Sequence, residues 1–238
     1  MANLALTSRS LPVRGVVLTA PRPAPVGVFL GVVGLFFAAL LMGGLNIVAS
    51  DQMSPLDTTM SDYVFVPRVG WMFGAAVLSM CVAGLGAMAG LAAIRLLGNG
   101  MLRVALALAV LGSLLAALFP TDLGESLSTS AQIHRYAAGV VFFCVPIAAY
   151  LVARSLTGVG YLARDRKLLY ANVIVTSVVL ALFMTSHFGP MPEVLQELNG
   201  LFQRMLFVLE LALLGQIVLL PLRFRAPRPT PALSAARG

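Results

Sequence analysis

The residues of this chain that could do chemistry lie in short polar stretches between long apolar ones. The stretch LFPTDLGESLSTSAQIHRYAAG, residues 118–139, holds Asp122, Glu125, His134 and Arg135. Carboxylate, imidazole and guanidinium groups in one place can bind charged ligands, transfer protons or hold a metal ion. They act together only where the surrounding elements hold them close.

Composition predicts that these elements lie in a membrane. Hydrophobic residues make up 59% and charged residues 11% of the 238 residues, and the mean hydropathy is +0.94. A soluble domain has roughly 45–50% apolar and about 25% charged residues. The apolar runs are each about 20 residues or longer, which is the length of a helix that crosses a hydrocarbon core of about 30 Å.

Six such runs predict an all-α fold, a six-transmembrane-helix bundle of a polytopic membrane protein. We expect one membrane domain over residues 26–222, with helices over residues 26–49, 69–97, 101–119, 131–157, 168–188 and 200–222. Residues 1–25 and 223–238 are rich in Pro, Arg, Ala and Ser, and such stretches bury too little apolar surface to fold. They are predicted to be disordered basic tails that touch lipid head groups.

The distribution of charge predicts the orientation of the bundle. If six helices alternate in direction, all Lys and Arg residues except Arg68, Arg135 and Arg204 fall on the side of the two termini. Basic residues are retained in the cytoplasm, so both termini are expected to be cytoplasmic. The opposite connections carry the acids Asp51, Asp57, Asp62, Asp122, Glu125, Glu193 and Glu197. This distribution accounts for the net charge of +7 and the pI near 10.3 without nucleic acid as a partner.

The three remaining arginines predict a polar site at the outer ends of the helices. Arg68, Arg135 and Arg204 stand where the second, fourth and sixth predicted helices begin. An arginine at a helix centre costs about 2.5–3.5 kcal/mol on insertion, so each one needs a head group or a partner. Either the side chains reach outward to lipid phosphates, or they turn inward and pair with acids such as Asp62 and Asp122. We favour the second interpretation, which predicts an outward-facing cavity.

The two histidines are expected to reach the same cavity. His134 and His187 stand at similar distances before and after the connection between the helices over residues 131–157 and 168–188. In an antiparallel hairpin they therefore lie at similar depth, near the outer surface.

Glu210 is the acid predicted to lie near the middle of the membrane. It stands well inside the helix over residues 200–222 and shares a helical face with Gln203. A carboxyl at this depth is a functional-site hypothesis by default. The alternative is a protonated acid that is hydrogen-bonded to a neighbouring helix through Asn46 or Ser113.

Four segments resemble the recurring segments of domain of unknown function 998, a family of bacterial six-helix membrane proteins. They are TTMSDYVFVPRVGWMFGAA, ALFPTDLGES, IHRYAAGVVFF and NGLFQRMLFVLELAL, and the resemblance covers roughly residues 26–222. Its most specific pieces are Ser61-Asp62, Phe119-Pro120-Thr121-Asp122, His134 and Arg204 after Gly200-Leu201. The resemblance implies the six-helix fold, the outer polar cluster and the plasma membrane of a bacterial cell. It implies no activity.

Together these patterns predict a cavity that binds a small anionic or lipid ligand, for binding alone or for transport. Its expected lining is Asp62, Arg68, Asp122, His134, Arg135, His187, Gln203 and Arg204. One alternative is an intramembrane enzyme that acts on lipids with a histidine as general base, and another is a structural or regulatory partner of a second membrane protein. No metal or other cofactor is predicted, because no HExxH or related spacing occurs. Zinc or haem held by His134 and His187 are the alternatives.

Overall fold

The computed structural model describes residues 25–122, 128–188 and 192–224, and the elements in these ranges are helices. The long ones are α1 (Pro25–Val48), α2 (Trp71–Ala93), α3 (Gly100–Leu118), α4 (Thr129–Ser155), α5 (Ala163–Phe188) and α7 (Asn199–Leu219). The short ones are η1 (Met60–Phe65), η2 (Leu96–Gly98), η3 (Gly160–Leu162), α6 (Glu193–Gln196) and η4 (Leu220–Arg223). The six long helices are each long and apolar enough to cross a membrane, which confirms the predicted all-α, multi-pass bundle.

Local signals set where these helices begin and end. α3 begins after Asn99, whose side chain accepts a hydrogen bond from the backbone N–H of Met101 at 3.0 Å. α4 begins after Ser128, whose hydroxyl caps its first turn. α2 ends at Ala93, before the predicted residue 97, because Arg95 adopts the left-handed conformation with a φ of 60°.

The predicted tails lie almost entirely outside the described residues. Arg223 is a described exception, in η4, where its guanidinium pairs with the carboxylate of Asp165 in α5. This ion pair joins the end of the last span to the beginning of the fifth.

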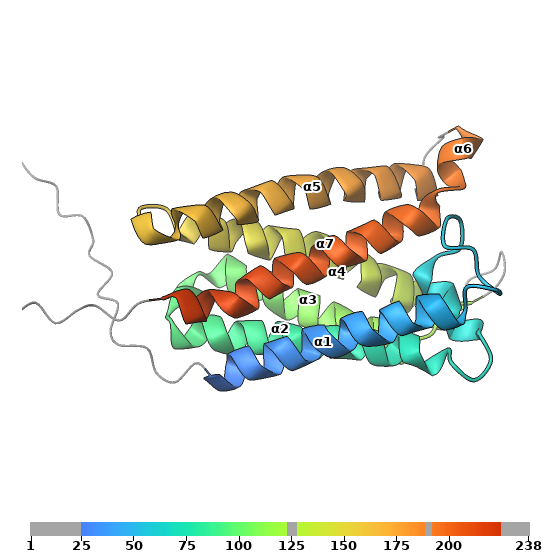
Figure 1. The fold of residues 1–238 in the computed structure, drawn as a ribbon, viewed down its shortest axis with the longest axis horizontal. Helices are drawn as coiled ribbons and strands as arrows, with labels where there is room; N and C mark the ends of the chain where they lie inside the picture. Colours follow the sequence, from blue (N-terminus) through green and yellow to red (C-terminus); the bar gives the residue numbers. More distant parts are fainter. Residues whose placement is uncertain (1–24, 123–127, 189–191, 225–238) are drawn as a thin grey trace, which may run out of the picture.

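The spans form three neighbouring antiparallel pairs, α1 with α2, α3 with α4, and α5 with α7 (Figure 1). α7 also contacts α1, α2 and α4, so the last span lies at the centre of the bundle. The first and last described residues lie at one end of the bundle. The connections from α1 to α2, from α3 to α4 and from α5 to α7 lie at the other end (Figure 1).

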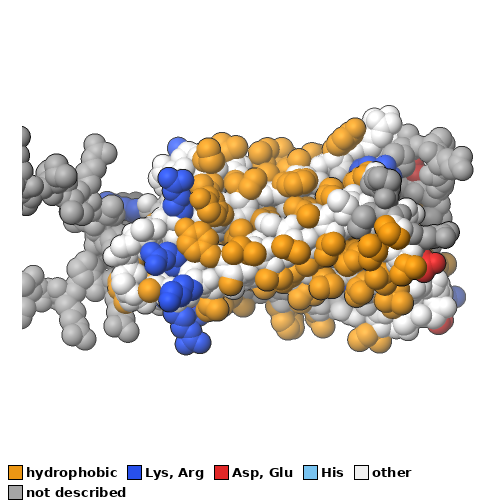
Figure 2. All heavy atoms as spheres, turned by 90° about the horizontal axis from the view of Figure 1, so that it is seen from above, with side chains coloured by type: hydrophobic (Ala, Val, Ile, Leu, Met, Phe, Trp, Pro, Cys, Tyr) orange, Lys and Arg blue, Asp and Glu red, His pale blue; other side chains and the backbone are white. Residues whose placement is uncertain are grey.

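Charge distinguishes the two ends of the bundle. Figure 2 shows a row of basic side chains at one end, acidic side chains with a few basic ones at the other, and a broad hydrophobic belt between them. We call the end with the described chain termini the basic end and the opposite end the acidic end. The basic end carries Arg95, Arg154, Arg164, Arg166, Lys167 and Arg223, and the acidic end carries Asp51, Asp57, Asp62, Asp122 and Glu197.

Small residues bring α1 and α2 into close contact. A Cβ added at Gly34 of α1 would lie 2.6 Å from the backbone nitrogen of Ala83 in α2, and one added at Gly27 would lie 2.6 Å from that of Gly90. In lipid, where there is no hydrophobic drive between helices, backbone contact of this kind supplies the attraction. The glycines therefore act inside the bundle, where they fix the α1–α2 pair.

Candidate ligand cavity

A cavity of about 640 Å³, which we call the vestibule, lies at the acidic end of the bundle. Its wall comes from α4, α5, the beginning of α7, and the connections that follow α1 and α3. The lining residues are Thr59, Ser61, Asp62, Thr121, Asp122, His134, Arg135, Tyr136, Ala138, Gly139, Phe142, Phe143, Phe183, Met184, His187, Phe188 and Gln203.

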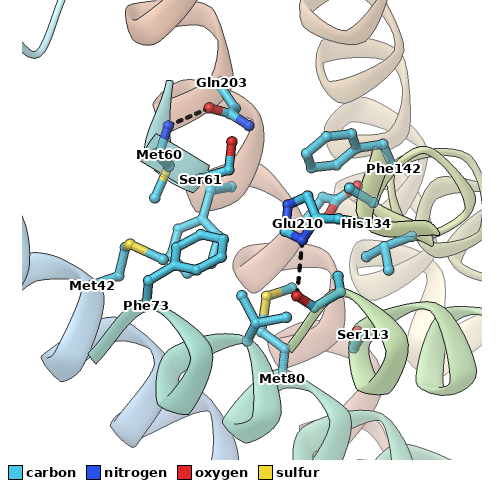
Figure 3. A pocket seen from close by; sticks show the side chains of 15 residues that line it. Met42, Met60, Ser61, Phe73, Met80, Ser113, His134, Phe142, Gln203 and Glu210 are labelled. Carbon is cyan, nitrogen blue, oxygen red and sulfur yellow. Dashed lines mark hydrogen bonds between the residues drawn. The ribbon is translucent and has the colours of Figure 1, made fainter. Parts of the chain in front are cut away.

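A second cavity of about 60 Å³, which we call the inner chamber, lies deeper in the bundle. It is lined by Met42, Met60, Ser61, Phe73, Val77, Met80, Ser113, Ala116, His134, Ala138, Val141, Phe142, Gln203, Phe207 and Glu210. Figure 3 shows Gln203 and Ser61 on one side of this chamber and Ser113 and Met80 on the other. The two cavities adjoin, because Ser61, His134, Ala138, Phe142 and Gln203 line both.

The structure brings most of the predicted site residues together and leaves two apart. The vestibule is lined by Asp62, Asp122, His134, Arg135, His187 and Gln203, as the sequence predicts. Arg68 and Arg204 line neither cavity. Arg68 is exposed in the turn before α2, with a φ of 69°.

Arg204 turns inward, but its partners are neutral oxygens rather than acids. Its guanidinium donates to the side-chain oxygen of Asn46 at 2.7 Å, the hydroxyl of Tyr63 at 2.8 Å and the carbonyl oxygen of Thr58 at 2.8 Å. It also donates to the carbonyl oxygen of Gly200 at 2.9 Å. Arg204 therefore ties α7 to α1 and to the α1–α2 connection, a role in holding the cavity wall rather than in lining it.

Gly200 allows that contact between α7 and the α1–α2 connection. A Cβ at this position would lie 2.9 Å from the carbonyl oxygen of Leu56, and the next residue, Leu201, donates its N–H to the same oxygen at 2.9 Å. Gln203 completes the contact, because its side-chain oxygen accepts the N–H of Met60 at 2.6 Å (Figure 3).

The two vestibule acids are hydrogen-bonded to neighbours in sequence. Asp62 accepts from the hydroxyl of Thr59 at 2.7 Å and from its N–H at 3.1 Å. Asp122 accepts from the N–H of Ser128 at 2.7 Å. Hydrogen bonds from the side chain and the backbone of Ser128 lower the pKa of Asp122 from its ordinary value of 3.8. Within the described residues neither acid forms an ion pair with an arginine, so the predicted pairing does not occur there.

Arg135 is the cation of the vestibule. It is exposed, and its guanidinium lies 6.0 Å from the centre of the Phe188 ring, at the outer edge of cation–π contact. Among the described residues, no carboxylate lies within salt-bridge distance of it. The side chain is therefore available to an anion that enters the cavity.

The two histidines differ in how firmly they are held. His134 is buried, and its Nδ1 lies 2.9 Å from the carbonyl oxygens of both Ala116 and Phe119. Carbonyl oxygens only accept, so Nδ1 carries the proton and donates, which leaves Nε2 as the second ring nitrogen. The half-buried ring of His187 stacks on Phe183, with ring centres 5.6 Å apart.

Glu210 is completely buried, with 0% of its surface exposed, and lines the inner chamber. Among the described residues neither of its carboxyl oxygens has a hydrogen-bond partner. The alternative partners suggested by the sequence are engaged elsewhere. Asn46 accepts from Tyr63 and Arg204, and the hydroxyl of Ser113 donates to the carbonyl oxygen of Ala109 at 2.9 Å. A buried polar group without a protein partner calls for an explanation, such as a bound water, an ion or a functional role.

With this geometry in view, comparison with known proteins gives one family. The chain matches the family described as "Protein of unknown function (DUF998)" over residues 26–219, which is most of its length. The chain belongs to this family. The matched region coincides with the six spans, and the family's description assigns no ligand, partner or reaction. No curated protein and no solved structure matches the chain.

The described part of this family member does not place a set of metal ligands together. Within it, no group of three or more His, Cys, Asp or Glu residues is close enough to hold a metal ion. Zinc sites in proteins use three or four such ligands. The alternative of zinc at His134 and His187 therefore has no support from the donor set, and haem at the same two residues stays an untested alternative.

Sequence reasoning missed the aromatic part of the vestibule and the partners of Arg204. Phe142, Phe183 and Phe188 line the vestibule, but in the sequence they look like any other apolar residues of a span. Asn46 and Tyr63 gave a usable signal. Each is a polar side chain at the acidic end of an apolar segment, where a buried polar group requires a partner.

Proposed function

We propose that this multi-pass membrane protein binds an amphiphile, with the anionic head group of the ligand in the vestibule. The observation that carries this proposal is Arg135, a guanidinium in a cavity of about 640 Å³ with no ion-pair partner among the described residues. Ligand cavities in proteins range over roughly 300–1,000 Å³, so the vestibule can hold a head group and the beginning of a chain.

The head group is expected to be anionic because the guanidinium matches phosphate and carboxylate. Arginine binds these groups through two parallel hydrogen bonds, which gives both energy and orientation. The vestibule acids Asp62 and Asp122 already accept hydrogen bonds from Thr59 and Ser128, so they compete little for Arg135. A group that carries both charges, such as a phosphate with an amine, would also suit this lining.

The apolar part of the ligand is expected to lie between α4 and α5. Tyr136, Phe143 and Phe188 line the vestibule, and 74%, 51% and 61% of their respective surfaces are exposed. In a membrane, the outside of the bundle at this level faces lipid. We expect their rings to contact the apolar part of the ligand, and the Phe188 ring lies beside the guanidinium of Arg135.

We further propose that the vestibule faces the outside of a bacterial plasma membrane and that both termini are cytoplasmic. Support comes from the concentration of Lys and Arg at the basic end, which the positive-inside rule assigns to the cytoplasm. A ligand would then enter from the outer leaflet or from the outer solution.

The test is native mass spectrometry of the full chain extracted in mild detergent, beside Arg135→Gln and a matched control, Arg68→Gln. Arg68 is an exposed arginine that lines neither cavity. Wild type and the control should retain the same lipid mass, and Arg135→Gln should lose it by roughly tenfold or more, because hydrogen bonds to a charged group contribute about 1.5–3 kcal/mol. Equal retention in all three proteins would refute the proposal.

A second arm separates a lipid from a free anion. Delipidated protein is titrated with phosphatidylglycerol in detergent micelles and, separately, with inorganic phosphate. Saturable binding of the lipid alone supports the amphiphile. Binding of phosphate alone would mean that the ligand is a soluble anion instead of an amphiphile. If neither binds and a second protein co-purifies with the wild type, the role of a structural partner of that protein is favoured.

A further inference from the structure

We propose that Glu210 is a proton-binding site and that His134 connects it to the vestibule. The motivating observation is a completely buried carboxyl in the inner chamber, with both oxygens unpartnered among the described residues. This proposal does not depend on the amphiphile site, because none of the residues that it uses is Arg135.

The inner chamber has room for a proton carrier. A cavity needs about 10–15 Å³ of accessible volume to hold one water molecule, and the chamber offers about 60 Å³. A water also needs polar partners, and the chamber is lined by the polar residues Ser61, Gln203 and His134 (Figure 3). Glu210 lines the same chamber but has no exposed surface, so water reaches its carboxyl when the surrounding side chains move aside.

The groups that face Glu210 make a proton the best-matched ligand. α1 and α2 contribute only apolar side chains to the chamber, Met42 and Met80 among them, and α3 contributes Ser113 and Ala116. Among the described residues, no Lys or Arg lines it. The titratable groups nearby both come from α4, namely His134 in the lining and the thiol of Cys144, which interacts electrostatically with Glu210. A carboxylate without a fixed cation here is neutralised most simply by a proton.

His134 is placed to carry that proton because it lines both cavities. Its Nδ1–H is held by the carbonyl oxygens of Ala116 and Phe119, which fixes the ring and leaves Nε2 to react. Nε2 takes a proton from a hydronium ion in the vestibule, which becomes water, and passes a proton on through chamber water to the carboxylate of Glu210. The carboxylate becomes a carboxylic acid and His134 returns to its starting form.

The charges near His134 come from the vestibule side. Asp62 in η1 interacts electrostatically with both His134 and His187, and Arg135 acts on His187. The negative charge of Asp62 attracts a proton toward the histidine that borders the inner chamber. The wall between the two cavities thus contains the titratable side chain that the route requires.

Infrared spectroscopy of the full chain in phosphatidylcholine vesicles tests this route. The signal of Glu210 is the carboxyl band that is present in the wild type and lost in Glu210→Gln. We expect this carboxyl to gain and lose a proton as the buffer is titrated from acidic to alkaline, and its band to shift after transfer into D₂O. His134→Asn, which keeps an N–H donor for the two carbonyl oxygens, should slow that shift by at least about tenfold.

His187→Asn is the matched control, because His187 lines the vestibule but not the inner chamber. In His187→Asn, the rate at which the Glu210 band shifts in D₂O should stay within about twofold of the wild-type rate. Equal rates in the wild type and His134→Asn would remove His134 from the route. A Glu210 band that neither titrates nor exchanges in the wild type would make the carboxyl a static structural acid and overturn the proposal.

Discussion

Arg204 shows, at the scale of single residues, how this protein accommodates a half-buried cation without an acid. Four neutral oxygens from Asn46, Tyr63, Thr58 and Gly200 surround its guanidinium at 2.7–2.9 Å. A guanidinium presents five N–H donors in a planar fork, so it can satisfy all of these oxygens at once. These four oxygen dipoles, rather than one negative charge, offset the desolvation of the guanidinium.

We expect Arg204→Lys to destabilise the protein even though the charge is retained. An ammonium group has three donors and a different shape, so at least one acceptor of the network loses its partner, at a cost of about 1.5–3 kcal/mol. The measurement is the free energy of unfolding from SDS titration of the detergent-solubilised protein. Arg68→Lys, at an exposed arginine, should change it by less than about 0.5 kcal/mol. Equal effects at both positions would contradict the structural role of the network.

Asp122 gives a prediction about acid. Ser128 lowers its pKa in the folded protein below 3.8, so its contribution to stability is complete above that pH and is lost as the pH falls through the lowered value. The free energy of unfolding should therefore fall less steeply below about pH 4 in Asp122→Asn than in the wild type. Parallel curves for the wild type and Asp122→Asn would refute this.

The sequence identified residue types better than it identified their partners. Asp62, Asp122, His134 and His187 do line one cavity, because polar residues at the ends of apolar spans have few other places to go. The partners of Arg204 include the backbone oxygens of Thr58 and Gly200, and every residue carries such an oxygen. No pattern of side chains could have distinguished them, which is why pairing with acids was expected instead.

At the scale of elements, the α1–α2 pair depends on glycines in contact with backbone. We expect Gly34→Ala to cost roughly 1–3 kcal/mol, because its Cβ would press on the backbone of Ser79 and Ala83. Gly43→Ala in the same helix is the control, since a Cβ there has no atom within 4 Å and alanine favours helix by up to about 1 kcal/mol. SDS titration of both variants measures the change in the free energy of unfolding. An unchanged free energy in Gly34→Ala would show that α1 and α2 can move apart without loss of stability.

The spans were predictable and their ends were not. A run of apolar residues long enough to cross the bilayer has few alternatives to helix, because the backbone must be hydrogen-bonded within the segment. The ends depend on single residues, such as the left-handed Arg95 after α2 and the cap formed by Asn99 before α3. The short helices η1 and α6 are below the length at which periodicity gives a signal.

At the scale of the whole molecule, the cavities exist because α7 is central and α5 is peripheral. α7 packs against α1, α2, α4 and α5, and it brings both Gln203 and Glu210 to the bundle interior. α5 contributes Phe183 and His187 to the vestibule and nothing to the inner chamber among the described residues. A cavity is the space left by six packed helices, so it depends on how their axes are placed, and the sequence of each span carries little of that information.

The orientation of the molecule decides which solution the vestibule meets, and cysteine labelling of intact cells can measure it. With Cys81 and Cys144 replaced by alanine, a single cysteine is placed at the exposed position of Asp51, at the acidic end, or of Thr157, at the basic end. The basic end is expected in the cytoplasm, so a membrane-impermeant maleimide should label Asp51→Cys in intact cells. Thr157→Cys should react only after the cells are lysed. The reverse pattern would place the vestibule in the cytoplasm, where its ligand would have to come from the inner leaflet, and labelling of both variants in intact cells would mean that the chain inserts in two directions.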